Sequence, residues 1–455
     1  MINGFKLIKA FLLYMLFSAF FKVLIVTITG SYLIGSLFIE ASILLIYFVF
    51  ITYLMKEGYH KIRLDWVKIY LLVLFIGSVV QSIYFISSFP GSGIDLYVRA
   101  FAPFRKYFFP LFLFSVFTYV LSNDLRKNNI KIFDQLIKFF NLILFIAIFY
   151  QFAEAILRLS PTFNAFYVNS FIAPAMNADI ETSTQLKSFA TNVKAFFPFG
   201  IRVGVLRIFG IGLDYFVSGS IIFLCYMYNA LFREDFKLFS LFNFIVFIAI
   251  LLTGTLQFIL PFFIFNFVLL FIKVKSNIIF RGMLIVLLLL IIASFSGRVF
   301  DAASGYGPSI MNILPEYIPN INLVIIGAGP LRTNLDIEGV LTNELDPRQI
   351  LFLESVGDVG YFRMTTEIGL ILCALFIIFY SSVIMSPGAI NRLSDKAQII
   401  IKKLKFLNLF TLLVFISHYL IYFSRTTMAF CLLLLSLLYS YSTYVKGDQI
   451  EKNSN

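Results

Sequence analysis

Residues 368–384 read IGLILCALFIIFYSSVI, and residues 283–295 read MLIVLLLLIIASF. Both stretches are continuously apolar, whereas the strands of a membrane barrel alternate polar and apolar side chains. A helix that spans the bilayer core needs about 20 predominantly apolar residues, and its backbone groups satisfy one another within the segment. These stretches therefore predict α-helices that cross a membrane.

The rest of the chain shares this character. Of its 455 residues, 60% are hydrophobic and 13% are charged, and the mean hydropathy is +0.92. Soluble domains are about half apolar and about a quarter charged, so lipid must cover much of this apolar surface. We predict an all-α polytopic membrane protein with about twelve transmembrane helices in a single transmembrane domain, residues 1–455. The expected spans are approximately 11–29, 33–54, 67–89, 107–121, 136–157, 213–231, 238–253, 256–272, 279–295, 361–384, 406–423 and 426–444.

The formal net charge of +12 would suggest a nucleic-acid partner in a soluble chain. Here most Lys and Arg residues fall in the two termini, in alternate short connections between the expected spans and at the adjoining span edges, where the positive-inside rule places them in the cytoplasm. Examples are the connections 55–66, 122–135, 273–278 and 385–405. The charge therefore predicts an orientation, with both termini cytoplasmic, and we expect no nucleic-acid partner.

Two long connections lie on the opposite, outer side in this topology, at residues 158–212 and 296–360. Connections of this length are usually functional or disordered. Both are rich in Phe, Tyr, Ile and Leu, which argues against disorder. Within the first, residues 185–200 place two lysines among apolar side chains and could form an amphipathic helix at the membrane interface.

The first group of charges that topology does not require lies in IRVGVLRIFGIGLDY, residues 201–215. Arg202 and Arg207 precede an expected span, and Asp214 follows them. They could be snorkelling side chains at a helix end. Arginine also binds phosphate and carboxylate groups through two hydrogen bonds, which suits an anionic lipid headgroup.

The second group lies in ESVGDVGYFRMTTEIGL, residues 354–370, and includes Asp358. Arg363 and Glu367 are four residues apart, so they share a helix face and could simply pair with each other. Charges at the mouth of a span also commonly face a bundle interior or a watery cavity, which makes them candidate site residues.

Further candidates are Arg298, which begins the second long connection, and His418, near the outer end of an expected span. A lone histidine is more often a hydrogen-bonded packing residue. Four other charged residues, Lys22, Glu40, Arg99 and Glu154, are expected to pair structurally. The three cysteines lie in apolar runs, and the two histidines lie on opposite sides, so we expect neither a metal nor a cofactor.

These features resemble the Wzy-type polysaccharide polymerases, which are relatives of the O-antigen ligases. The resemblance rests on the many spans, the two long outer loops, Arg207-x-x-Gly-x-x-x-Asp214 and Asp358-x-Gly-Tyr-x-Arg363-x-x-x-Glu367-x-Gly369. It implies a glycosyltransferase on the outer face of the bacterial inner membrane. Such an enzyme transfers a growing glycan from undecaprenyl diphosphate to a lipid-linked repeat unit. The implied partners are the lipid-linked oligosaccharide, the bilayer and a chain-length regulator protein.

The chemistry of this reaction suggests roles for the charged candidates. A lipid diphosphate leaving group needs its developing negative charge stabilised, for which arginines are suited. The strongest candidates to bind the diphosphate are Arg207 and Arg202. Arg363 ranks next, and Arg298 ranks after it. A base must accept the proton of the attacking hydroxyl, and the candidates, left unranked, are Asp358, Glu367, Asp214 and His418.

Three alternatives stay open. The related ligases typically carry a histidine before the late span, where this chain has Asp358, which favours the polymerase. A flippase or transporter of lipid-linked sugars fits the number of spans, but transporters place their binding groups near the membrane midplane and often show a repeat. A structural scaffold would leave the unexplained arginines without a shared purpose.

Overall fold

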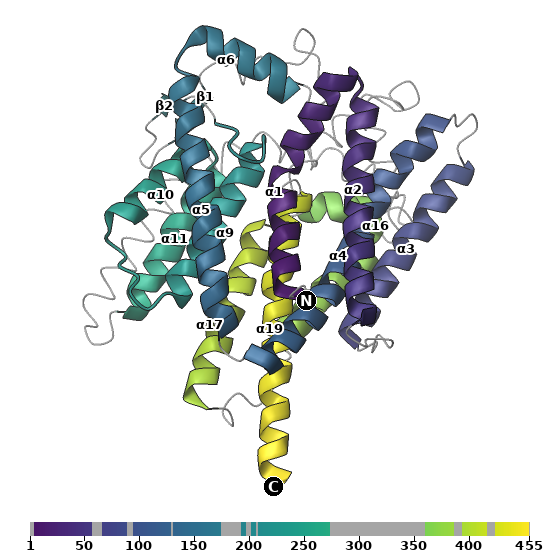
Figure 1. Ribbon diagram of the computed structural model, residues 1–455, viewed down its shortest axis with the longest axis vertical. Helices are drawn as coiled ribbons and strands as arrows, with labels where there is room; N and C mark the ends of the chain where they lie inside the picture. Colours follow the sequence, from purple (N-terminus) through teal and green to yellow (C-terminus); the bar gives the residue numbers. More distant parts are fainter. Residues whose placement is uncertain are drawn as a thin grey trace, which may run out of the picture. The chain divides into compact units, whose positions relative to one another are not determined.

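The computed structural model describes residues 4–56, 66–88, 94–128, 131–173, 193–196, 202–205, 208–273, 360–385, 394–415 and 424–454 (Figure 1). The chain divides into two compact units. Unit 1 comprises Met1–His60 and Ile130–Arg298, and unit 2 comprises Lys61–Asn129 and Val299–Asn455. Each unit is described by itself, and the single transmembrane domain expected from the sequence stays a prediction.

Unit 1 is built mainly of helices. Its elements are α1 (Gly4–Thr29), α2 (Tyr32–Lys56), α5 (Lys131–Leu157), α6 (Pro161–Tyr167), the π-helix η1 (Val168–Ile172), β1 (Val193–Phe196), β2 (Arg202–Val205), α9 (Tyr215–Phe232), α10 (Leu241–Leu252) and α11 (Leu256–Lys273). Helix α1 packs against α2, α5 packs against α9, and α10 contacts α5, α9 and α11. Short α6 runs across the end of α5 (Figure 1).

Helix α1 is antiparallel to α2, and α5 is antiparallel to α9, as the ring contacts between them show. The rings of Phe133 and Phe232 stack at 5.6 Å, so the N-terminal end of α5 meets the C-terminal end of α9. Phe11 in α1 contacts Phe50 in α2 at 5.9 Å, and Phe20 contacts Tyr150 in α5 at 5.4 Å. The C-terminal ends of α1 and α5 therefore lie at the same end of unit 1 as the N-terminal end of α9.

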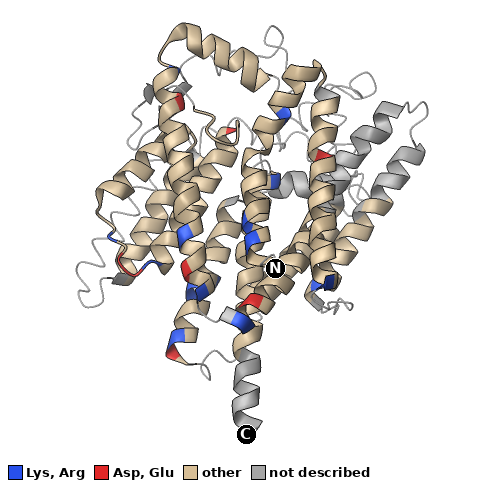
Figure 2. Ribbon diagram, in the orientation of Figure 1, with Lys and Arg blue, Asp and Glu red and all other residues tan. Residues whose placement is uncertain are grey.

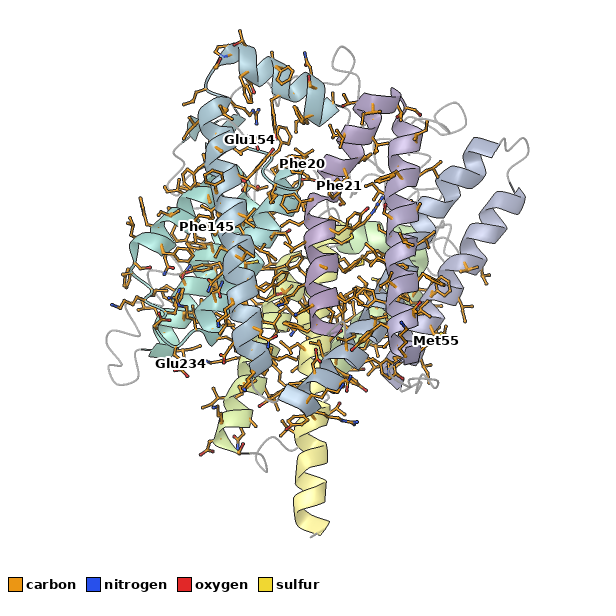
Figure 3. All side chains as sticks on the ribbon, in the orientation of Figure 1. Phe20, Phe21, Met55, Phe145, Glu154 and Glu234 are labelled. Atoms are coloured by element: carbon orange, nitrogen blue, oxygen red, sulfur yellow. The ribbon has the colours of Figure 1, made fainter. Side chains whose placement is uncertain are left out.

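Helix α5 shows why these helices belong in a bilayer. One face is buried in unit 1, while Leu142, Phe145, Phe149 and Ile156 recur at helical spacing on the opposite face and are all at least 50% exposed. Figure 3 labels Phe145 on this face. Such a long exposed apolar stripe would be a liability in water, whereas lipid covers it without cost.

Charge is distributed unevenly along unit 1. Most of the length of its helices is free of charged residues (Figure 2). One end carries a set of basic residues at the termini of α1, α2, α5 and α9, namely Lys6, Lys9, Lys56, Lys131, Lys138, Arg233 and Lys237. We call this the basic end. The gathering of basic residues at one end is what the positive-inside rule predicts, and its cytoplasmic assignment stays a prediction.

Unit 2 contains α3 (Trp66–Ser88), α4 (Ile94–Asn128), α16 (Gly360–Met385), α17 (Asp395–Phe415) and α19 (Arg425–Ser454). Its most extensive contact joins α4 to α19, and α3 packs against both α4 and α16. On α19, the hydroxyls of Ser436 and Ser440 donate to the carbonyls of Phe114 and Thr118 at 3.4 and 3.1 Å. Small hydroxyl side chains let helices approach closely and hydrogen-bond across the contact, as is common in membrane bundles.

Helix α16 is broken at Gly369, which has φ 77° and ψ 166°. The sequence predicted one continuous span over 361–384. A glycine reaches this conformation without the steric penalty of a side chain, so the chain changes direction there. The break separates the turns that carry Arg363 and Glu367 from the apolar helix that follows.

Described helices coincide with eleven of the twelve expected spans, although the span 406–423 is described only as far as residue 415. The remaining span, 279–295, lies outside the described residues. Five are long and apolar enough to cross a bilayer, at Gly4–Thr29, Ile34–Lys56, Lys131–Leu157, Tyr215–Phe232 and Arg425–Val445. Helix α10 is shorter than expected, since the side chain of Ser240 caps its start and Gly254, with φ 63°, follows its end. Its 12 residues span about 18 Å, less than a bilayer core of about 30 Å. The helical, membrane character is confirmed, whereas the total of twelve crossings and their orientation stay predictions.

The first long connection contains more structure than the sequence predicted. It holds α6, η1 and an antiparallel hairpin in which Val193 pairs with Val205 and Phe196 pairs with Arg202. The amphipathic helix expected over 185–200 is therefore wrong at 193–196, which form a strand. Pro198 is poorly tolerated inside a helix, and Val and Phe, as at Val193 and Phe196, favour a strand. Nearly all of the second long connection, residues 296–359, lies outside the described residues.

Candidate functional site

The best-defined polar site of the described residues lies in unit 1, at the end opposite the basic end. Glu154 and Arg158 stand one turn apart near the C-terminal end of α5, and their side chains are 2% and 0% exposed. Arg158 Nη1 donates to Glu154 Oε1 at 2.9 Å. Figure 3 labels Glu154 beneath α6.

Glu154 also binds backbone that is remote in sequence. The N–H of Phe209 donates to its Oε1 at 3.0 Å, and the N–H of Gly210 donates to its Oε2 at 2.7 Å. A buried carboxylate is costly unless it is both paired and hydrogen-bonded. Glu154 meets both conditions, and both of its oxygens are occupied.

Arg158 extends the site to α6. Its Nε donates to Asn164 Oδ1 at 2.7 Å. Its guanidinium carbon lies 5.1 Å from the ring centroid of Phe209 and 5.7 Å from that of Tyr167, within the range of cation–π attraction. We call Glu154, Arg158, Asn164 and the backbone N–H groups of Phe209 and Gly210 the Glu154 brace.

The turn that Glu154 binds has no room for a larger residue at Gly210. Gly210 has φ +70°, and a Cβ there would lie 2.3 Å from Gln151 Oε1 and 2.6 Å from the Ser218 side chain. Leu213 also has a positive φ, 49°, which is unusual for a residue with a side chain. The hydroxyl of Ser218 ties the turn together, since it donates to the Phe209 carbonyl at 2.6 Å and accepts from the Gly212 N–H at 3.1 Å.

Apolar packing encloses the brace. A buried cluster joins α1, η1 and the turn before α9, and comprises Val23, Tyr167, Val168, Ile172, Ala173, Phe209 and Leu213. The hydroxyls of Tyr150 and Tyr167 lie 2.9 Å apart. Burial raises the pKa of Tyr167 above its ordinary value, and the negative charge of Glu154 raises it further, so this phenol stays neutral at physiological pH.

Asp214 follows the turn and caps α9. Its Oδ1 accepts from the N–H of Phe216 at 2.7 Å. Burial raises the pKa of the Asp214 carboxyl, while hydrogen bonds from the backbone of Phe216 and Val217 partly lower it. The sequence predicted Asp214 as one of four candidate bases, and the structure gives it a capping role that occupies one oxygen.

The other predicted site residues are less fully described. The backbone of Arg202 lies in β2, and the backbones of Arg363 and Glu367 lie in α16, before the break at Gly369. The positions of Arg207, Arg298, Asp358 and His418 lie outside the described residues. The grouping of these residues into one diphosphate site stays a prediction.

Only part of the Glu154 brace was predictable from the sequence. Glu154 was expected to pair structurally, but its partner was not assigned. The signal was an acid and an arginine four residues apart at the end of an apolar run, where a charge is costly unless it is paired. The hydrogen bonds to Phe209 and Gly210 cross 55 and 56 residues, a separation that spacing rules do not reach.

No family model, no curated protein and no solved structure matches this chain. Among the described residues, no three His, Cys, Asp or Glu side chains are grouped so that they could hold a metal ion.

Proposed function

We propose that this chain is a polysaccharide polymerase, a glycosyltransferase that joins undecaprenyl-diphosphate-linked repeat units on the outer face of a bacterial inner membrane. The observation that carries the proposal is the Glu154 brace. It binds the backbone between Arg207 and Asp214 to a membrane-spanning helix, at the end of unit 1 that lies opposite the basic end. A fixed backbone that directly follows Arg207 in the sequence suits recognition of a lipid diphosphate by the arginines of this segment.

In the proposed reaction, a hydroxyl oxygen of the new repeat unit attacks the anomeric carbon of the growing glycan. The bond from that carbon to the diphosphate oxygen breaks, and undecaprenyl diphosphate leaves with the electron pair. Arg207 and Arg202, with Arg363 and Arg298, stabilise the charge on the leaving oxygens without a metal ion.

The proton of the attacking hydroxyl passes to one of the candidate bases. Asp214 is disfavoured as the base because its Oδ1 already caps α9. The proposal therefore favours Asp358, Glu367 or His418. A chain-length regulator protein is the expected protein partner.

The decisive test is elongation by the purified protein. We expect it to convert a lipid-linked repeat unit into a ladder of longer glycans in the presence of a chelator. Arg207→Ala and Arg363→Ala should each lower the rate by about 100-fold or more, because each removes a donor to the developing charge.

Arg233→Ala is the matched control, since Arg233 is an exposed arginine at the basic end that pairs with Asp235. It should keep the wild-type ladder. Normal ladders from both Arg207→Ala and Arg363→Ala would contradict the proposed roles of the arginines. Translocation of the lipid-linked unit without elongation would identify a flippase, and transfer only to a different lipid acceptor would identify a ligase.

A further inference from the structure

We propose that Glu154 and Arg158 are positioning residues for the segment that carries Arg202 and Arg207. The catalytic part of this inference rests on the function proposed above. The structural part, that one turn of α5 holds both ends of the first long connection together, is independent of it.

The start of the connection is held by Arg158. This residue follows the last residue of α5, and its Nε reaches Asn164 in α6 at 2.7 Å. Its guanidinium also lies against the ring of Tyr167, which ends α6. The Arg158 side chain thereby holds α6 in its position across the end of α5.

The end of the connection is held by Glu154. Both carboxylate oxygens accept backbone N–H groups, from Phe209 and Gly210. The backbone N–H of Ile208 also donates to the Leu252 carbonyl, at the end of α10, at 3.0 Å. The fixed backbone therefore begins at the residue that directly follows Arg207 in the sequence.

The ion pair between Glu154 and Arg158 joins these two ends, and both meet again in the apolar cluster that contains Ile172, Ala173, Phe209 and Leu213. The residues between the two ends of the connection include the β1–β2 hairpin, Arg202 and Arg207. This stretch of chain therefore begins and ends at the Glu154 brace. The Glu154 brace thus anchors both ends of the segment that carries Arg202 and Arg207 to the end of α5.

Stability alone does not account for a charged pair here. Well-packed apolar residues often replace a buried ion pair without loss of stability, and the best attested use of buried polar groups is to fix register. Apolar side chains could fill this corner, but they could not accept two backbone N–H groups in a set direction. Glu154 supplies that direction, and Arg158 neutralises and orients Glu154.

The test compares backbone exchange with catalysis in the full-length protein. The variants are Glu154→Gln, which keeps the shape and loses the charge, and Arg158→Met, which removes the ion pair. Glu234→Gln is the matched control, because Glu234 is exposed at the basic end (Figure 3). Hydrogen–deuterium exchange is followed in peptides that cover residues 208–214 and, for comparison, 221–231 inside α9.

Both brace variants should speed amide exchange at Phe209 and Gly210 by about tenfold, the effect of one weakened hydrogen bond. Exchange inside α9 should stay at the wild-type rate, which excludes general unfolding. In the elongation assay, we expect kcat to fall by about 10- to 100-fold with little change in the KM for the acceptor, because the arginines are proposed to bind the diphosphate that leaves from the donor. Glu234→Gln should match the wild type in both measurements.

Unchanged exchange at Phe209 and Gly210 in both variants would overturn the inference. Faster exchange with an unchanged kcat would also overturn it, since the segment would then be released without consequence for the reaction. If the wild-type protein forms no ladder, the proposed function fails and the catalytic role fails with it. The exchange data would still decide whether Glu154 holds the connection.

Discussion

The two ends of unit 1 each carry an arginine paired with an acid, in opposite surroundings. At the basic end, Arg233 and Asp235 pair through contacts of 2.5 and 2.7 Å, and their side chains are 44% and 67% exposed. At the other end, Arg158 and Glu154 pair at 2.9 Å with almost no exposure. The distances are similar, so the separation of the charged atoms does not by itself distinguish the two pairs.

Burial and extra partners do distinguish them. Water reaches the Arg233–Asp235 pair, so both charged groups form hydrogen bonds to water when the pair is broken. Breaking the Glu154–Arg158 pair leaves a charge inside the protein and releases backbone N–H groups of a distant segment. Of these two salt bridges, the buried one contributes to tertiary structure, because Glu154 also accepts hydrogen bonds from backbone that is remote in sequence.

The sharpest way to break this comparison is to remove one partner at each end. Glu154→Ala should lower the free energy of unfolding by about 3–5 kcal/mol, because it removes the carboxylate that pairs with the buried Arg158 and accepts two backbone N–H groups. Asp235→Ala should leave unfolding essentially unchanged. Denaturant unfolding of the two variants in one detergent measures the difference.

The double variant Glu154→Leu/Arg158→Met refines the same measurement. Its loss of unfolding free energy should be smaller than the sum of the losses in Glu154→Leu and Arg158→Met, because neither charged group then stays in the protein without the other. Strict additivity would show that the two side chains do not act as a pair. Equal losses from Glu154→Ala and Asp235→Ala would show that burial does not set the difference between the ends.

Crowding at the Glu154 brace gives the next largest effect. Gly210 and Gly30 both have positive φ, +70° and +65°, but a Cβ at Gly30 meets nothing within 4 Å, while one at Gly210 lies 2.3 Å from Gln151 Oε1. Gly30→Ala should cost about 1 kcal/mol for its backbone conformation, and Gly210→Ala about 3 kcal/mol, because overpacking is added.

The difference in unfolding free energy between these two variants isolates the cost of overpacking, since the backbone strain is common to both. Equal losses would mean that the side chains around Gly210 move aside freely. The turn would then not be the rigid part of the connection that the Glu154 brace requires.

The contrast between local and long-range interactions explains how much of the fold could be predicted from the sequence. Apolar runs located the helices well, because hydrophobic length is a local property of the sequence. Their ends were less certain. Helix α9 begins at Tyr215 rather than at 213, because Leu213 takes a positive φ and Asp214 acts as its cap. The Asp in this position is a helix start signal that could have placed the boundary.

The candidate site was less predictable for a physical reason. The spacing of Glu154 and Arg158 made their pairing accessible from the sequence, but their role depends on Asn164, Phe209 and Gly210, which tertiary packing brings to them. The break of α16 at Gly369 is similar, because an isolated glycine within an apolar run is tolerated in many helices. Local pattern indicates which residues need a partner, and the fold determines which partner they get.

The smallest expected effect is a difference in the sign of pH dependence between the two ends. Burial raises the pKa of Asp214, near the Glu154 brace, whereas the hydrogen bond from Arg233 lowers the pKa of Asp235. A raised pKa means that the folded state binds more protons than the unfolded state between the ordinary and the raised values, so stability falls as pH rises through that window. A lowered pKa has the opposite consequence, and the stability contributed by Asp235 is lost as pH falls below its ordinary value.

Asp214→Asn keeps a side-chain oxygen that can cap α9 and removes the titration. We expect the fall in stability with rising pH to become shallower in this variant, so that above the window it is at least as stable as the wild type. Asp235→Asn should instead remove only a slight loss of stability at acidic pH, because its carboxylate is exposed and screened. Thermal unfolding of the wild type and both variants from acidic to neutral pH measures both slopes. A loss of stability in Asp214→Asn at neutral pH would mean that Asp214 is needed there as an anion, and would restore it as a candidate base beside Asp358, Glu367 and His418.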